Sequence, residues 1–132
     1  MILHLKITGA LLVILSLIHI VFPKQFEWTK ELSSLTLLNR QMMYIHTFFI
    51  ALVVLLMGLL CLAAPEDLIN TKIGKIILIG LFIFWAARLA IQFVGYSSKL
   101  WRGKRKETVI HILFSILWTY LTMVFLFSYL QE

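Results

Sequence analysis

The chain has 132 residues, a formal net charge of +6 and a 61% share of hydrophobic residues, which are gathered in long runs. Its length corresponds to one domain over residues 1–132, and its composition is typical of an integral membrane protein and excludes a soluble globular core. The single cysteine, Cys61, lies inside an apolar run, so a disulfide-stapled fold is excluded as well.

Four apolar segments each come close to the ~20 residues that a helix needs to cross a bilayer. They cover roughly residues 5–22, 41–64, 74–97 and 109–130. None of them alternates with a period of two, so helices are expected rather than the strands of a barrel. The sequence therefore predicts an all-α integral membrane protein whose four transmembrane helices form an up-down antiparallel bundle.

The connections between these segments contain residues that start and stop helices. Pro23 is expected to end the first helix, because proline lacks an amide proton and its ring clashes with the preceding turn. Pro65 is expected to close the second helix for the same reason. Ser33 or Ser34 is the expected N-cap of the second helix, and Thr108 is the expected N-cap of the fourth.

The basic residues are divided unequally between the two sides of the predicted membrane. One side holds Lys24, Lys30, Arg40, Lys99, Arg102, Lys104, Arg105 and Lys106, and the other holds Lys6, Lys72 and Lys75. The positive-inside rule places the larger set in the cytoplasm and both termini on the non-cytoplasmic side. The cluster over 99–106 then indicates topology and attraction to membrane lipids rather than binding of nucleic acid. We expect an energy-transducing membrane, such as the bacterial inner membrane.

Polar residues of all four segments gather at the predicted cytoplasmic edge. His19 lies one turn before the end of the first segment, and His111 lies near the start of the fourth. His46 follows Arg40 by six residues, about 9 Å into the second helix. Arg88 lies in the last turns of the third segment. Polar groups that face hydrocarbon stay unsatisfied, so these side chains are expected to turn inward and form a pocket.

Arg88, Gln92 and Tyr96 are spaced by four residues and therefore share one face of the third helix. A guanidinium group in the membrane cannot lose its proton, so Arg88 must reach acceptors, water or the interface. One alternative is that Arg88 extends along its stem to the headgroups. Another is that the histidines and hydroxyl groups serve only as hydrogen bonds between helices.

The first functional hypothesis is a b-type haem. The four segments contain no Asp or Glu, which argues against a carboxylate-bridged di-iron site, and leaves imidazole as the metal-binding group. His46 and His111 are the candidate axial ligands, and Arg40 and Arg88 are candidates to hold the propionates. Gln92 and Tyr96 would complete the cofactor pocket. Such a protein would pass electrons, with a quinol as a candidate partner.

The second hypothesis is a single zinc or copper ion held by His19, His46 and His111, because three imidazoles leave a fourth position open. Gln92 would then orient a ligand of the metal. Arg88 would suit an anionic headgroup, which suggests a variant of this hypothesis: a membrane enzyme that acts on a lipid, with a histidine as general base. The third hypothesis is a non-catalytic accessory subunit that docks on another membrane subunit. The favoured expectation is a haem- or metal-binding redox protein, and no enzyme class is assigned.

Overall fold

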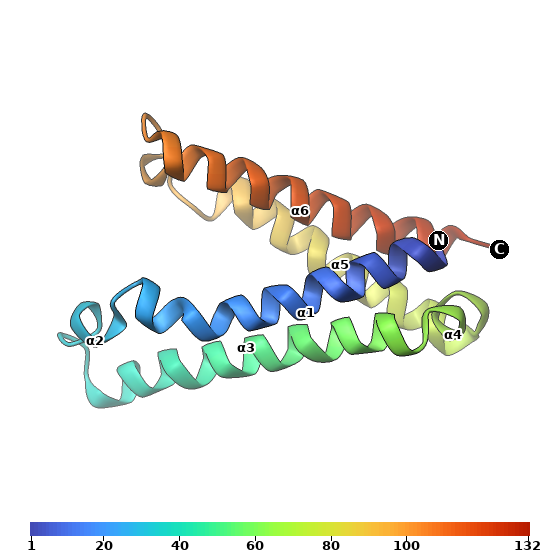
Figure 1. Ribbon diagram of the computed structural model, residues 1–132, viewed down its shortest axis with the longest axis horizontal. Coiled ribbons are helices and arrows are strands. Elements are labelled where there is room, and N and C mark those ends of the chain that lie inside the picture. Colours follow the sequence, from blue (N-terminus) through green and yellow to red (C-terminus); the bar gives the residue numbers. More distant parts are fainter. The chain divides into compact units, whose positions relative to one another are not determined.

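The computed structural model describes residues 1–132, except for the side chain of Ser98, and the described residues contain helices and no strand. The elements are α1 (Ile2–Gln25), α2 (Trp28–Glu31), α3 (Leu37–Ala63), α4 (Pro65–Asn70), α5 (Lys72–Val94), the short 3₁₀ helix η1 (Ser98–Leu100) and α6 (Arg105–Leu130) (Figure 1). Helices α1, α3, α5 and α6 are long and apolar enough to cross a membrane. This confirms the predicted all-helical protein with four candidate spans, whereas the sides on which its termini lie stay a prediction.

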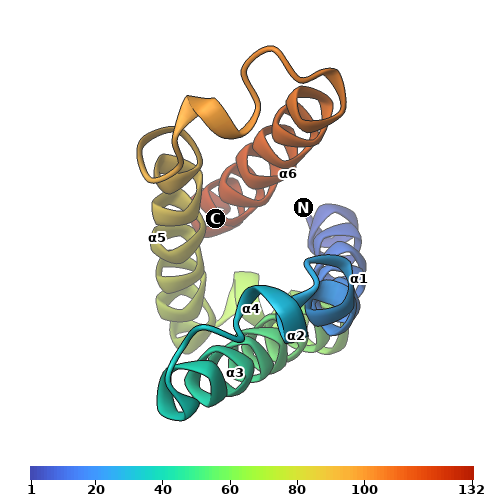
Figure 2. The same ribbon diagram turned by 90° about the vertical axis from the view of Figure 1, so that its left-hand side faces the viewer.

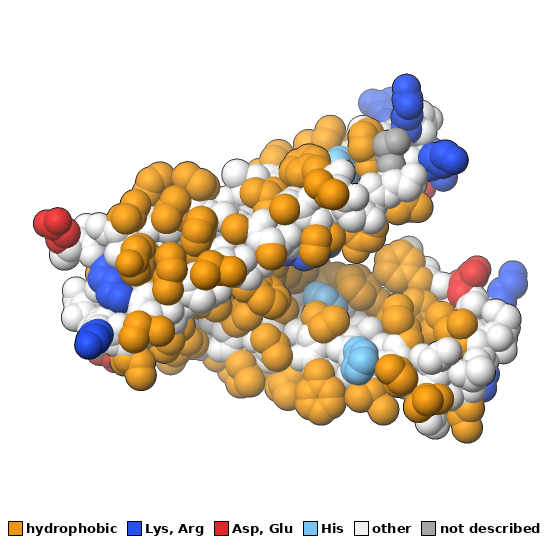
Figure 3. Space-filling model, turned by 180° about the vertical axis from the view of Figure 1, so that it is seen from behind, with side chains coloured by type: hydrophobic (Ala, Val, Ile, Leu, Met, Phe, Trp, Pro, Cys, Tyr) orange, Lys and Arg blue, Asp and Glu red, His pale blue; other side chains and the backbone are white. Residues whose placement is uncertain are grey.

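Hydrophobic side chains cover most of the visible surface of these helices, and most of the charged side chains gather toward the helix ends (Figure 3). The chain divides into two compact units, one of Met1–Leu5 with Pro65–Glu132 and the other of Lys6–Ala64. The single domain expected from the sequence stays a prediction.

The first unit contains the helix pair α5 and α6, which run in opposite directions. Lys75, at the start of α5, donates hydrogen bonds from Nζ to the carbonyls of Ser128 at 3.2 Å, Tyr129 at 2.9 Å and Gln131, all at the end of α6. A cation at the C-terminus of a helix stabilises the exposed carbonyls there and interacts favourably with the helix dipole. At the opposite end of the pair, the segment between Val94 and Arg105 connects the two helices (Figure 2).

The second unit contains α3 and the part of α1 from Lys6 onward, and these two helices approach closely at two glycines. A Cβ atom built on Gly58 would lie 2.8 Å from the carbonyl oxygen of Gly9, and one built on Gly9 would lie 2.8 Å from the carbonyl oxygen of Gly58. Membrane helices use such small residues to bring their backbones together, since packing rather than hydrophobic burial drives their association. The crossing point therefore leaves no room for a side chain on either helix.

The structure corrects the prediction that Pro23 ends the first helix. Helix α1 continues to Gln25 with Pro23 inside its last turn, and Phe26 still donates to the carbonyl of Phe22 at 2.9 Å. Proline removes only its own hydrogen bond, so the residues that follow it continue the ladder for a short distance. Pro65 behaves as expected, because α3 ends two residues before it.

Both predicted N-caps are also corrected. The N-cap of α3 is Thr36, whose hydroxyl accepts from the amide of Asn39 at 3.3 Å, whereas Ser33 donates to the carbonyl of Lys30 at 2.6 Å. Ser34 lies in the turn before Thr36. Helix α6 already begins at Arg105, and Thr108 donates to the carbonyl of Trp101 at 2.6 Å instead of capping the helix. Neighbouring hydroxyl groups compete for the same backbone donors and acceptors. Which of them becomes the N-cap therefore depends on the backbone conformation before the helix.

Candidate functional site

Gln92 is the centre of a hydrogen-bonded network between α5 and α6, and only 7% of its surface is exposed. Its Oε1 accepts from Nη1 of Arg88 at 3.3 Å and from Nε1 of Trp118 at 3.2 Å. Its Nε2 lies 2.9 Å from Nδ1 of His111. Three of the predicted site residues, Arg88, Gln92 and His111, are therefore joined in the first unit, together with Trp118.

The partners of Gln92 determine the direction of every hydrogen bond in this network. The guanidinium of Arg88 and the indole of Trp118 are donors only, so the amide oxygen must face them. The amide nitrogen of Gln92 then donates to Nδ1 of His111, which must accept. A neutral imidazole carries one proton, so that proton lies on Nε2 of His111. The network thus makes Nε2 of His111 a hydrogen-bond donor.

Arg88 lies six residues before the end of α5, about 9 Å along the helix. Its guanidinium carbon is 4.8 Å from the ring centroid of Trp118 and 5.6 Å from that of Tyr96. Both distances are within the range of a cation–π interaction. The only acidic residue in α5 and α6 is Glu107, in the first turn of α6. Aromatic faces and one amide oxygen, rather than a carboxylate, are thus the partners of this cation within its unit.

Aromatic rings hold His111 and Trp118 in place. The ring of Trp101 stacks on His111 at 4.6 Å and 16°, and the ring of Phe93 meets His111 edge-on at 5.7 Å. Trp118 is stacked on Trp85 at 5.3 Å and 17°. Such pairs contribute about 0.5–1.5 kcal/mol each beyond their buried area. The orientation of the imidazole is therefore fixed by packing as well as by Gln92.

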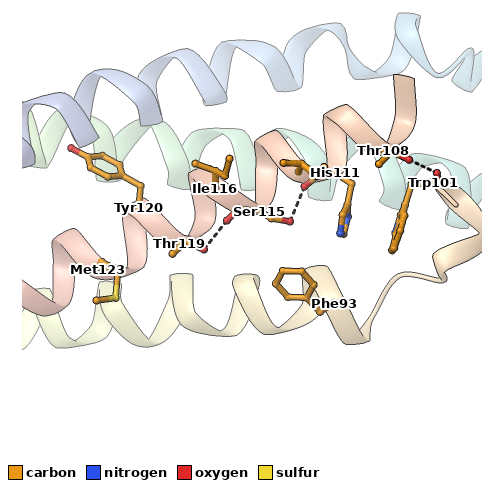
Figure 4. A pocket seen from close by; sticks show the side chains of 10 residues that line it. Phe93, Trp101, Thr108, His111, Ser115, Ile116, Thr119, Tyr120 and Met123 are labelled. Atoms are coloured by element: carbon orange, nitrogen blue, oxygen red, sulfur yellow. Dashed lines mark hydrogen bonds between the residues drawn. The ribbon is translucent and has the colours of Figure 1, made fainter. Parts of the chain in front are cut away.

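A groove of about 690 Å³ runs along one face of α6 beside His111. It is lined by Phe93, Trp101, Thr108, His111, Ile112, Ser115, Ile116, Thr119, Tyr120 and Met123 (Figure 4). The stretch of α6 from Thr108 to Met123 covers about 22 Å at the helical rise of 1.5 Å per residue.

The hydroxyl groups that line this groove contribute little polarity to it. Ser115 donates to the carbonyl of His111 at 2.7 Å, and Thr119 donates to the carbonyl of Ser115 at 2.8 Å (Figure 4). Thr108 is bonded to Trp101 as described above, so the protons of these three hydroxyl groups are used by the backbone of the first unit. The fourth hydroxyl group, that of Tyr120, lies 3.0 Å from Nδ1 of His4. The groove is therefore a largely apolar channel, and the imidazole of His111 is among the side chains that line it.

Tyr96 belongs to the first unit, and the three remaining predicted site residues belong to the second. His46 is exposed on α3, Arg40 is half-buried in the first turn of the same helix, and His19 lines a small cavity between α1 and α3. Among the described residues, no group of three or more His, Cys, Asp or Glu side chains is placed to hold a metal ion. The haem between His46 and His111 and the three-histidine metal site stay predictions, since each combines residues of the two units.

Comparison of the chain with protein-family models, with curated proteins and with solved structures found no match. The site combines an elongated, largely apolar groove with an imidazole whose protonated nitrogen is determined by the two donors that bind Gln92. Trp118 and Trp101 were not among the predicted site residues, although Trp118 follows His111 by seven residues and so shares its helical face.

Proposed function

We propose that this membrane protein binds a neutral, lipid-soluble carbonyl compound, of which a quinone is the class we favour, in the groove beside His111. The observation that carries the proposal is the network in which Arg88 and Trp118 fix the amide of Gln92 and thereby the proton on Nε2 of His111. A carbonyl oxygen of the ligand head accepts this proton in a hydrogen bond. The apolar tail of the ligand lies along α6.

The dimensions and lining of the groove support an amphiphile of this kind. Its volume of about 690 Å³ lies in the usual range for small-molecule sites, which is roughly 300–1,000 Å³. Such sites are mostly apolar, with a few polar groups that fix the orientation of the ligand. Phe93 and Trp101 add flat aromatic walls at the end where His111 lies, and these suit a planar ring.

The hydrogen-bond direction supports a carbonyl head over a hydroxyl head. A carbonyl oxygen accepts the proton of His111 and has no proton of its own to satisfy. A hydroxyl group in the same position would accept that proton too, but its own proton would then need one of the hydroxyl oxygens of the groove as acceptor, and a donor left unpaired costs about 1–3 kcal/mol. Arg88 does not line the groove, so an anionic head finds no counter-charge there among the lining side chains.

Titration of the purified protein in detergent or nanodiscs with a short-chain ubiquinone analogue tests the proposal, with quenching of tryptophan fluorescence as the signal. His111→Leu is expected to weaken binding about tenfold or more, since it removes the donor. His111→Gln is expected to retain part of the affinity, because its amide nitrogen reaches toward the same position. His46→Leu, which replaces an exposed histidine of the other unit, is the matched control.

Two further titrations identify the ligand class. A Trp101→Phe variant should lose most of the quenching, because Trp101 lines the groove and stacks on His111. A diacylglycerol analogue, whose ester groups are also neutral acceptors, separates a lipid ligand from a quinone. Equal affinity of the wild-type protein and His111→Leu for both probes would overturn the proposal.

The haem and metal hypotheses keep a test of their own. Ligation of a metal by Nε2 of His111 requires a lone pair on that nitrogen, so the ring proton would have to lie on Nδ1. The amide of Gln92 would then have to turn its oxygen toward Nδ1, and its NH₂ group would face the donors of Arg88 and Trp118. A Soret band that disappears in both His46→Ala and His111→Ala would support haem. Stoichiometric zinc or copper by elemental analysis would support a metal site or a lipid-headgroup enzyme. A colourless, metal-free protein without ligand affinity would support the accessory-subunit hypothesis.

A further inference from the structure

The second unit contains a cavity of about 220 Å³ between α1 and α3. It is lined by His19, Ile20, Pro23, Tyr44, Thr47, Phe48 and Ala51. His19 lies six residues before the end of α1, about 9 Å along the helix. This depth brings a polar side chain inside the apolar span, where a polar group without a partner is costly.

The hydrogen bonding of His19 is the reverse of that of His111. Nδ1 of His19 lies 2.8 Å from the backbone carbonyl of Leu15, and a carbonyl oxygen accepts only. Nδ1 therefore carries the proton of the neutral ring, and Nε2 presents a lone pair. The ring of Phe22 packs against the imidazole at 4.7 Å, which helps to hold this orientation.

The polar neighbours of His19 in the cavity leave this lone pair without a donor inside the unit. The hydroxyl of Thr47 donates to the carbonyl of Met43 at 2.8 Å, so its proton is used. The ring of Tyr44 packs edge-on against Trp28 at 5.3 Å, and its hydroxyl makes no hydrogen bond to His19 within the unit. His19 thus brings an acceptor to the lining of a cavity whose other residues, apart from Thr47, are apolar or aromatic.

We infer that this cavity is a second ligand site, which binds the hydroxyl head of a membrane amphiphile through donation of its proton to Nε2 of His19. A hydroquinone or another phenol is the fitting class, because Tyr44 and Phe48 line the cavity with aromatic rings. The cavity is smaller than the groove beside His111 and admits a ring-sized head rather than a tail. No Asp, Glu or Cys lines it, so a metal ion would find one nitrogen and no second strong ligand.

This inference does not depend on the groove beside His111, because the residues of the two sites belong to different units. If both sites are correct, the protein offers a donor to a carbonyl head and an acceptor to a hydroxyl head. These are the oxidised and the reduced heads of one kind of molecule.

The experiment uses the full-length protein with ¹⁵N-labelled histidine in detergent and two probes, a short-chain hydroquinone under anaerobic conditions and its dimethyl ether. The hydroquinone is expected to shift the Nε2 resonance of His19, and the ether, which has no proton to donate, is not. His19→Phe is expected to weaken hydroquinone binding at least tenfold. His19→Gln, whose amide oxygen reaches a similar position, should restore part of it.

His46→Phe is the matched control in the same unit, since His46 is exposed and does not line the cavity. Circular dichroism confirms that each variant keeps its helices. Equal shifts by the hydroquinone and the ether, or unchanged affinity in His19→Phe, would overturn the inference. A stoichiometric response of His19 to added zinc without any response to the hydroquinone would overturn it as well, and would assign the cavity to a metal ion.

Discussion

Replacing Gln92 by glutamate changes the direction of one hydrogen bond while keeping the size of the side chain. A carboxylate has two acceptor oxygens and no proton. One oxygen keeps the bonds from Arg88 and Trp118, and the guanidinium, already 3.3 Å from the amide oxygen, balances the new charge. The other oxygen then faces Nδ1 of His111 and requires a donor there. The proton of the imidazole moves to Nδ1, and Nε2 is left with a lone pair and becomes an acceptor.

The magnitude of the effect on ligand binding follows from this reversal. A carbonyl head loses its hydrogen bond to His111 and meets a lone pair instead. An unsatisfied buried acceptor costs about 1–3 kcal/mol, which corresponds to a loss of affinity of about five- to 150-fold. The stability of the helix pair should change much less, because Arg88 and Trp118 keep their acceptor.

Nitrogen NMR of the ¹⁵N-labelled imidazole measures the reversal directly, since protonated and unprotonated ring nitrogens resonate in separate ranges. The wild-type protein should show His111 protonated at Nε2, and Gln92→Glu should show it protonated at Nδ1. Ligand affinity is measured in parallel by fluorescence titration. A wild-type His111 protonated at Nδ1, or a Gln92→Glu variant that keeps the proton on Nε2 and the full affinity, would refute the reasoning.

The remaining predictions concern the helix pairs. Gly58→Ala should destabilise the second unit by about 1–3 kcal/mol, because its Cβ would lie 2.8 Å from the carbonyl of Gly9; the measurement is denaturant unfolding in detergent followed by circular dichroism. Gly80→Ala is its matched control and should stabilise α5 by roughly 0.5–1 kcal/mol, since nothing lies within 4 Å of the added carbon. Lys75→Met removes the cation from the end of α6 and should cost about 1 kcal/mol, seen as faster hydrogen exchange in the last turn; unchanged exchange would show that the cap contributes nothing.

The four candidate spans were predictable because a run of about 20 apolar residues has few other uses. Their ends were less predictable. Pro23 was expected to stop α1, but a proline near a helix end removes one hydrogen bond and leaves the next ones possible. The choice of Thr36 over Ser33 as N-cap depended on which hydroxyl already had a backbone acceptor, and residue types do not reveal this.

Part of the hydrogen-bonded network could be predicted from the sequence, whereas its chemistry could not. The spacing of four residues placed Arg88 and Gln92 on one face, and in the structure Arg88 donates to Gln92, which in turn bonds to His111. The role of His111 as a donor depends on Trp118, which lies 26 residues from Gln92 along the chain, so it follows from tertiary contact alone. His19 and His111 looked equivalent in sequence. In the structure, a backbone carbonyl places the proton of His19 on Nδ1, whereas the amide of Gln92 places the proton of His111 on Nε2.

The contact of Lys75 with the end of α6 also bears on how the chain enters its membrane. Lys75 precedes Ser128 by 53 residues, so the carbonyls that it binds are synthesised only after α5 has been made. Until synthesis of α6 is complete, this ammonium group has to stay with water or lipid headgroups. Docking of α6 then gives the lysine its partners, so this hairpin can close only after α6 has been made.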